Sequence, residues 1–145
     1  MRTLAASLAL SLAACNPTVC GRETCEDPGA QVTFEHEAWA DGAWSLQLDY
    51  GGEILTCAFN LPVADLDGAY CADGRVALTY VDGAPASAWI SGEPPESVAV
   101  VLQHTVDEVT TTPLDASVAI DQGEEFPNGP GCPPGCRTYT LTLAF

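Results

Sequence analysis

The chain has 145 residues, of which 20 are Asp or Glu and four are Arg, with no Lys, so its formal net charge is −16. The electric field of so negative a chain repels nucleic acid and anionic lipid surfaces, which argues against both as partners. A cationic ligand or partner fits the charge, although scattered carboxylates also serve solubility alone. The length suits one domain with its own core.

The first 14 residues have the pattern of an export signal. Arg2 supplies a positive charge, and an apolar stretch broken only by two serines follows as far as Ala14. A helix that spans a bilayer needs about 20 apolar residues, and this stretch is shorter. We therefore expect residues 1–14 to be a cleaved signal peptide.

The end of that stretch, Leu12-Ala13-Ala14-Cys15, resembles the lipobox of bacterial lipoprotein precursors. In that family the signal is cut before the cysteine, which receives diacylglyceryl and N-acyl chains. The resemblance implies lipidation of Cys15 and attachment to a lipid bilayer, which is stable when more than one acyl chain is buried. In the Gram-negative family an Asp at the next position favours the inner membrane, so Asn16 implies an outer-membrane lipoprotein of the cell envelope. The alternative is an ordinary signal followed by a stray cysteine.

Residues 15–29 are expected to be a flexible tether. They include Pro17 and Pro28 and show no apolar periodicity. A tether of about 14 residues reaches at most about 45 Å when fully extended. Residues 30–145 then form the folded domain.

Six cysteines remain if Cys15 is lipidated, and six in an exported chain predict three disulfides. Their spacings also resemble those of metal ligands, but disulfides suit an oxidising compartment better. Pairing sequence neighbours across short loops predicts Cys20–Cys25, Cys57–Cys71 and Cys132–Cys136.

The clearest structural signal is a hairpin around Gly51-Gly52. Residues 44–50 and 55–61 each alternate apolar with polar or small side chains, the period of a half-buried strand. A two-residue turn and this pattern specify one register. It opposes Leu48 to Leu55, Leu46 to Cys57 and Trp44 to Phe59.

Other alternating segments predict further strands at 32–38, 76–80, 98–106, 114–120 and 139–145. A two-residue turn at Asp41-Gly42 would oppose glutamates to leucines, so we expect a loop of three or five residues there. The Gly- and Pro-rich segments 82–97 and 121–136 are expected to be loops, apart from a short apolar run in the first.

Seven or eight short strands without a helical period predict an all-β fold, a small antiparallel β-sandwich stapled by disulfides. This part of the chain resembles the immunoglobulin-like or transthyretin-like domains of secreted bacterial proteins. A small barrel is the alternative architecture.

Two sets of residues could hold a metal. His36 and His104 fall on the apolar faces of their strands and with a carboxylate could bind zinc, or they could simply lie at the rim of the core. Asp65, Asp67 and Asp73 resemble the opening of a calcium loop, but the closing bidentate Glu is missing, so a solvated acidic loop is the alternative.

No catalytic residues are identified. The chain lacks Gly-x-Ser-x-Gly and any Lys, so we expect no enzyme. We expect a non-catalytic binding or structural module that contacts another envelope protein or a cationic ligand. The segments 82–97 and 121–136, with Trp89 and Phe126, are the expected contact surface. The alternative is a calcium- or zinc-dependent sensor or hydrolase.

Overall fold

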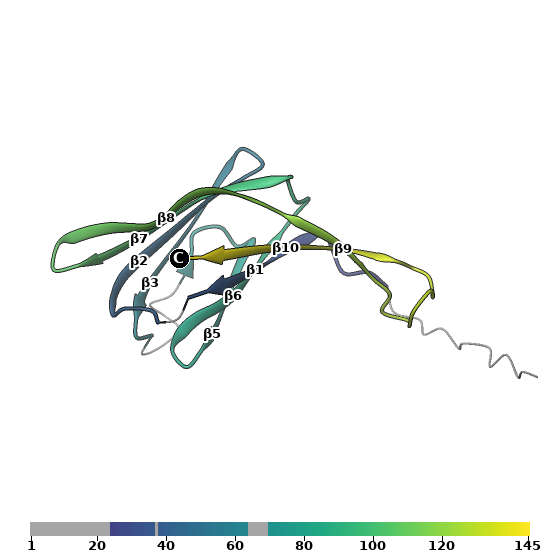
Figure 1. Cartoon of the computed structure of the whole chain (residues 1–145), viewed down its shortest axis with the longest axis horizontal. Coiled ribbons are helices and arrows are strands. Elements are labelled where there is room, and N and C mark those ends of the chain that lie inside the picture. Colours follow the sequence, from purple (N-terminus) through teal and green to yellow (C-terminus); the bar gives the residue numbers. More distant parts are fainter. Residues whose placement is uncertain (1–23, 37, 64–69) are drawn as a thin grey trace, which may run out of the picture.

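Two β-sheets pack against each other to form the folded part of the chain (Figure 1). The computed structural model describes residues 24–36, 38–63 and 70–145. These ranges contain ten strands and no helix, and therefore no helix long and apolar enough to cross a membrane. The expected all-β sandwich is confirmed.

The first sheet joins strands from both ends of the described chain. Its order is β5 (Val76–Val81), β6 (Ala84–Ser91), β1 (Gly29–Glu35), β10 (Cys136–Ala144) and β9 (Asp121–Glu125). The β1–β10 pair is parallel, and the other neighbours are antiparallel.

The second sheet is antiparallel throughout. Its order is β4 (Tyr70–Cys71), β3 (Glu53–Leu61), β2 (Gly42–Tyr50), β7 (Ser97–Val106) and β8 (Val109–Ala119). Its β2–β3 hairpin has the predicted register, with Trp44 opposite Phe59, Leu46 opposite Cys57 and Leu48 opposite Leu55.

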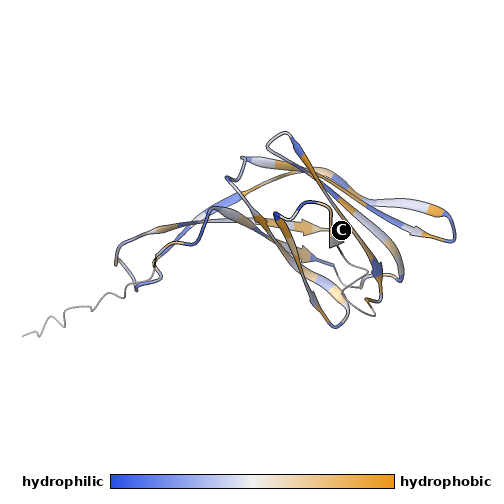
Figure 2. Ribbon diagram, turned by 180° about the vertical axis from the view of Figure 1, so that it is seen from behind, coloured by the Kyte–Doolittle hydropathy of each residue, from blue (hydrophilic) through white to orange (hydrophobic). Residues whose placement is uncertain are grey.

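Alternate side chains of the two sheets meet to form the core. Apolar residues recur along the strands of both layers (Figure 2), as expected when one face of each sheet is buried. The largest fully buried side chains are Phe59, Leu46, Leu48, Leu55, Ile90, Leu102, Leu141 and Leu143.

The predicted loop between the first two strands is wrong, because β1 and β2 do not form a hairpin. They lie in different sheets, and the chain crosses from one layer to the other between Glu35 and Gly42. Each strand turns its apolar face toward the core from its own layer. Glu35 is therefore not placed opposite a leucine of β2, as it would be in a hairpin with a two-residue turn.

Two segments predicted as loops contain strands. Residues 84–91 form β6, whose buried positions are Pro85, Ala88 and Ile90. The alternation of apolar and polar residues is hard to see in this strand, because two of its buried positions hold a proline and an alanine. A register shift opposite Pro85 also interrupts the period of two. Residues 121–125 form β9, an edge strand without a buried residue. The count of seven or eight strands was therefore too low.

Two tyrosines, the buried Tyr50 and the half-buried Tyr80, provide a matched pair of variants. The hydroxyl of Tyr50 donates to the carbonyl of Gly92 at 3.3 Å. The buried hydroxyl of Tyr80 has no hydrogen-bond partner among the residues that the structure describes. We expect Tyr50→Phe to lower the free energy of unfolding by about 1 kcal/mol and Tyr80→Phe to leave it unchanged or raise it, because an unsatisfied buried group is removed. Urea denaturation measures both, and a larger cost for Tyr80→Phe would contradict the environments described.

The same tyrosines predict alkaline destabilisation. Burial raises the pKa of Tyr50 and of Tyr80 from 10.0 to about 12, with the charge of Glu93 contributing at Tyr50. The folded state therefore resists deprotonation more than the unfolded state. Stability should be retained below pH 10 and fall as the pH rises from 10 toward 12. Unfolding curves across this range test it, and the double variant Tyr50→Phe/Tyr80→Phe should show a shallower fall.

Candidate functional site

A narrow neck extends from one end of the sandwich (Figure 1). It consists of residues 24–28 and the β9–β10 hairpin from Asp121 to Thr138. A disulfide between Cys25 and Cys136 joins its two parts, with a Cα–Cα distance of 5.3 Å. The β7–β8 turn lies at the opposite end of the molecule.

The disulfides only partly follow the prediction. Cys57–Cys71 is confirmed. Cys20–Cys25 and Cys132–Cys136 are wrong, because Cys25 and Cys136 bond to each other across 111 residues. Cys132 is also disulfide-bonded, and Cys20 lies outside the described residues. The parallel pairing of β1 with β10 brings Cys25 beside Cys136, which no local spacing reveals.

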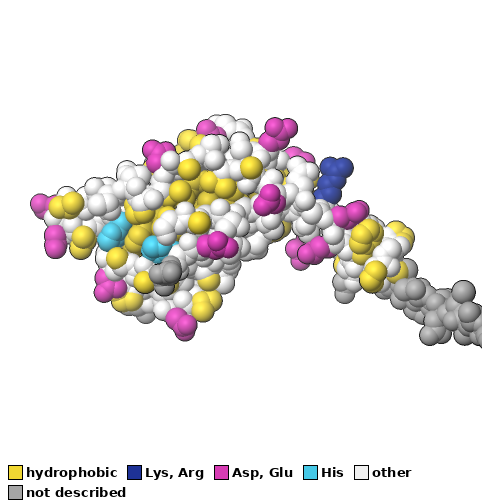
Figure 3. All heavy atoms as spheres, in the orientation of Figure 1, with side chains coloured by type: hydrophobic (Ala, Val, Ile, Leu, Met, Phe, Trp, Pro, Cys, Tyr) yellow, Lys and Arg dark blue, Asp and Glu magenta, His cyan; other side chains and the backbone are white. Residues whose placement is uncertain are grey.

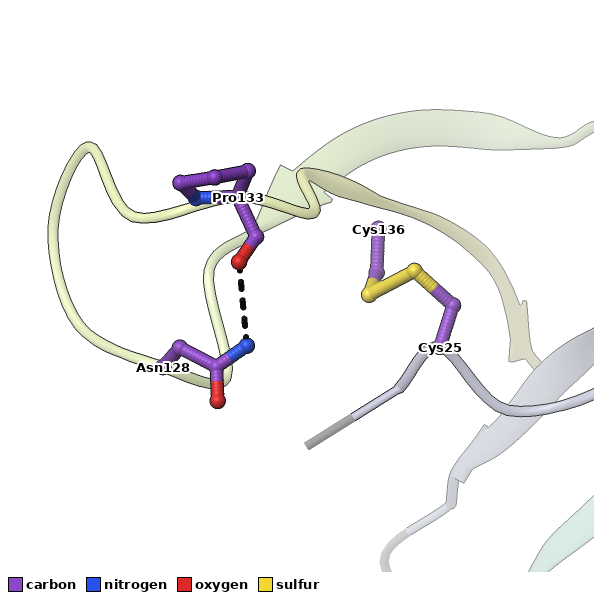
Figure 4. Close-up of a disulfide and its surroundings, with 4 residues drawn as sticks. All are labelled: Cys25, Asn128, Pro133 and Cys136. Atoms are coloured by element: carbon purple, nitrogen blue, oxygen red, sulfur yellow. Dashed lines mark hydrogen bonds between the residues drawn. A yellow bond between two sulfur atoms is a disulfide. The ribbon is translucent and has the colours of Figure 1, made fainter. Parts of the chain in front are cut away.

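The loop at the tip of the neck folds back on itself (Figure 4). The side-chain amide of Asn128 donates to the carbonyl of Pro133 at 3.1 Å. Backbone bonds from Gly129 to Phe126 and from Cys132 to Gly129 close two turns. Asn128 and Cys132 are buried in this loop.

A groove of about 420 Å³ runs where the neck meets the outer face of the first sheet. Four parts of the chain line it: the segment before β1, the start of β1, β6, and the two strands of the neck hairpin. The lining residues are Thr24, Cys25, Glu26, Asp27, Pro28, Gly29, Gln31, Trp89, Glu125, Pro127, Cys136, Arg137, Thr138, Tyr139 and Thr140.

Trp89 in this groove rests on the backbone of β1. A Cβ at position 29 would collide with the indole ring, so Gly29 permits the close approach. Gln31 and Ala77 are its cross-strand neighbours. Since the Ala77 side chain is small, it does not cover the indole on that side, and Trp89 remains partly exposed.

The charge of the groove is mixed. Glu26, Asp27 and Glu125 supply carboxylates, and Arg137 supplies a guanidinium. Within the described residues Arg137 forms no ion pair, whereas Arg75 binds Glu53 and Asp73. Arg137 therefore remains available to a ligand.

The two histidines lie elsewhere, near each other on one face (Figure 3). His36 hydrogen-bonds through Nδ1 to the carbonyl of Phe145 and stacks on that ring, with 4.3 Å between centroids. His104 donates from Nε2 to the carbonyl of Asp41 at 2.9 Å and stacks on Trp44. Both rings thus extend the aromatic edge of the core.

Trp39 belongs to the same edge. Its ring makes edge contacts with Phe34, Trp44, Phe59 and Phe145. It covers the end of the core. The described residues contain no group of three or more His, Cys, Asp or Glu side chains that could hold a metal ion.

The predicted calcium loop is only partly within the described residues. Asp65 and Asp67 lie outside them. The carboxylate of Asp73 accepts hydrogen bonds from the side chain of Arg75, which hold the pKa of Asp73 below its usual range. Calcium binding at this loop stays a prediction.

Comparison with other proteins identifies no relative. No family model, curated protein or solved structure matches this chain. The candidate site therefore rests on geometry alone. Of its residues, sequence reasoning singled out Trp89 and the segment 121–136 but missed Gln31, Arg137 and Thr140. The threonines at every second position of β10 were the available signal, since all three of them face away from the core.

Proposed function

We propose that this protein is an outer-membrane lipoprotein of the bacterial envelope, lipidated at Cys15, whose sandwich is a non-catalytic binding module. The observation that supports binding is the groove. Trp89 comes from one segment expected to form the contact surface, and Glu125 and Pro127 come from the other. Two segments far apart in sequence thus meet in one concave site.

The tether limits where the groove lies relative to the membrane. Fewer than ten residues separate Cys15 from Thr24, the first groove residue. Such a segment spans at most about 35 Å when fully extended. A lipidated Cys15 would therefore keep the groove near the bilayer, with the β7–β8 turn farther away.

Intact-mass analysis of protein extracted from membranes tests the anchor. We expect a mass that lacks residues 1–14 and includes acyl chains, and we expect Cys15→Ser to release the protein into the soluble fraction. A mass equal to unmodified residues 15–145, or one that retains Met1, would contradict lipidation.

Melting curves with EDTA, Ca²⁺ or Zn²⁺ test whether the protein binds a metal ion, which the proposed binding module does not require. We expect the same melting temperature in each. A ligand present at 100 times its dissociation constant stabilises a protein by about 2.7 kcal/mol. An upward shift of several degrees with either ion would instead support the metal-dependent sensor or hydrolase.

A further inference from the structure

The outer face of the first sheet is uncharged at its centre, although the chain has 20 acidic residues. The inward positions of β1, β6 and β10 are buried and apolar, so the alternate side chains point outward. Apart from Glu35 at the end of β1, the outward side chains that form the middle of this face on the central strands and on β5 bear hydroxyl, amide or small apolar groups, with one indole. They are Gln31, Thr33, Ala77, Thr79, Ser87, Trp89, Thr138, Thr140 and Thr142.

The strand registers arrange these groups in rows across the sheet. One row runs from Trp89 through Gln31 to Thr140. Neighbouring strands lie about 4.8 Å apart, so this row is about 10 Å long, close to the length of a disaccharide. All three residues also line the groove, so the row forms part of its wall.

Trp89 is the tryptophan that is available for binding. The indole N–H of Trp44 donates to the carbonyl of Ala40 at 2.9 Å. No described residue accepts a hydrogen bond from the Trp89 indole, which is partly exposed in the groove and supported from behind by Gly29. A rigid aromatic ring with a free polar group suits a ligand that has both apolar C–H faces and hydroxyls.

From this arrangement we infer that the groove binds a neutral oligosaccharide. The inference rests on the proposed binding function and names its ligand class. The Trp89 ring stacks on one sugar ring. The amide of Gln31 and the hydroxyl of Thr140 then meet the hydroxyls of the next ring. The Gln31 amide donates to Val32 at 3.3 Å and keeps its oxygen and a second N–H for the ligand.

The charges at the groove disfavour an acidic ligand and leave a neutral sugar and a cation as the alternatives. An acidic glycan would be repelled by a chain of net charge −16. A polyamine would meet the carboxylates of Glu26, Asp27 and Glu125, and Asp121 lies opposite Thr140 at the end of the row, so spermine is the competing ligand that the titration below has to distinguish. The row from Trp89 to Thr140 itself offers indole, amide and hydroxyl groups, which suit a sugar. For a sugar, carboxylates and guanidinium act as hydrogen-bond acceptors and donors at the rim.

Nuclear magnetic resonance titration of the oxidised, exported protein with Cys15→Ser tests this inference. The probes are hexasaccharides of β-1,4-linked glucose, mannose and N-acetylglucosamine, with spermine as the cationic probe. The Trp89 indole signal is the one lost in Trp89→Phe. We expect at least one hexasaccharide to shift this signal and the Gln31 amide signals, and spermine to leave them in place.

Variants locate the binding. Trp89→Ala should weaken the affinity at least tenfold, and Gln31→Ala should weaken it by a smaller factor. Gln47→Ala, an exposed glutamine on β2 in the other sheet, is the matched control and should bind normally. If Trp89→Ala does not fold, Trp89→Phe and Gln31→Ala provide the same comparison.

Three results would overturn the inference: no hexasaccharide shifts the Trp89 signal, Trp89→Ala and Gln31→Ala bind as well as the parent, or only spermine binds. The mass analysis of Cys15 is independent of these outcomes. A lipidated protein that binds no sugar would thus refute the ligand class and leave the envelope anchor intact.

Discussion

Phe59→Ala is expected to lower the free energy of unfolding by about 3–5 kcal/mol. Phe59 is 2% exposed, and its ring contacts Trp39 and Tyr80 at centroid distances of 5.8 and 6.4 Å. Truncation leaves a cavity among aromatic side chains that cannot collapse easily. Since small domains have only about 5–15 kcal/mol of stability, the urea midpoint should fall sharply.

Ile54→Ala is the control for this substitution, because it removes an aliphatic side chain from the same strand. Ile54 is 63% exposed, and we expect its loss to change the free energy of unfolding by no more than about 0.5 kcal/mol. Equal effects of Phe59→Ala and Ile54→Ala would show that β3 does not present its odd-numbered side chains to the core.

Removal of the Cys57–Cys71 disulfide is expected to cost about 3 kcal/mol, the chain-entropy estimate for a loop of this length. The bridge joins β3 to the short edge strand β4 across a sequence separation of 14. Cys57 is 1% exposed, so the substitution should be made to Ala, which adds no buried polar atom. Urea denaturation of Cys57→Ala/Cys71→Ala measures the loss.

Thr56→Ala on the outward side of β3 gives the baseline for that experiment. It removes a neighbouring side chain and keeps the bridge. If the double cysteine variant were no less stable than Thr56→Ala, the disulfide would have no role in holding β4 against β3.

The sequence predicts best where two local signals agree. At the β2–β3 hairpin, Gly51-Gly52 requires a two-residue turn, and the alternation around it allows one register. At β9 neither signal exists, because none of its side chains is buried and its order comes from pairing with β10. At β6, Pro85 and Ala88 occupy buried positions that a hydrophobic pattern does not register.

The candidate site was harder to predict, because strands from both ends of the described chain build it. Gln31 and Thr140 are register partners, and Cys25 is bonded to Cys136. Pairing cysteines by sequence proximity assumes that disulfides close short loops. The β1–β10 pairing instead brings together two cysteines that are 111 residues apart. Trp89 could be recognised from the sequence by its residue type, but its neighbours Gln31 and Thr140 can be recognised only from the order of strands in the sheet.

The parallel β1–β10 pair also sets the order in which this protein can fold. β6 can pair with β1 once residue 91 has been made, but β10 becomes available only after residue 144. Contacts between such distant segments have a high entropic cost of loop closure. Topologies dominated by them therefore fold slowly, in milliseconds to seconds. Until β10 docks, a nascent chain exposes one edge of β1, with unpaired N–H and C=O groups open to strands of other molecules. Aggregation of chains that lack β10 is thus the hazard that this topology creates, and the docking of β10 removes it.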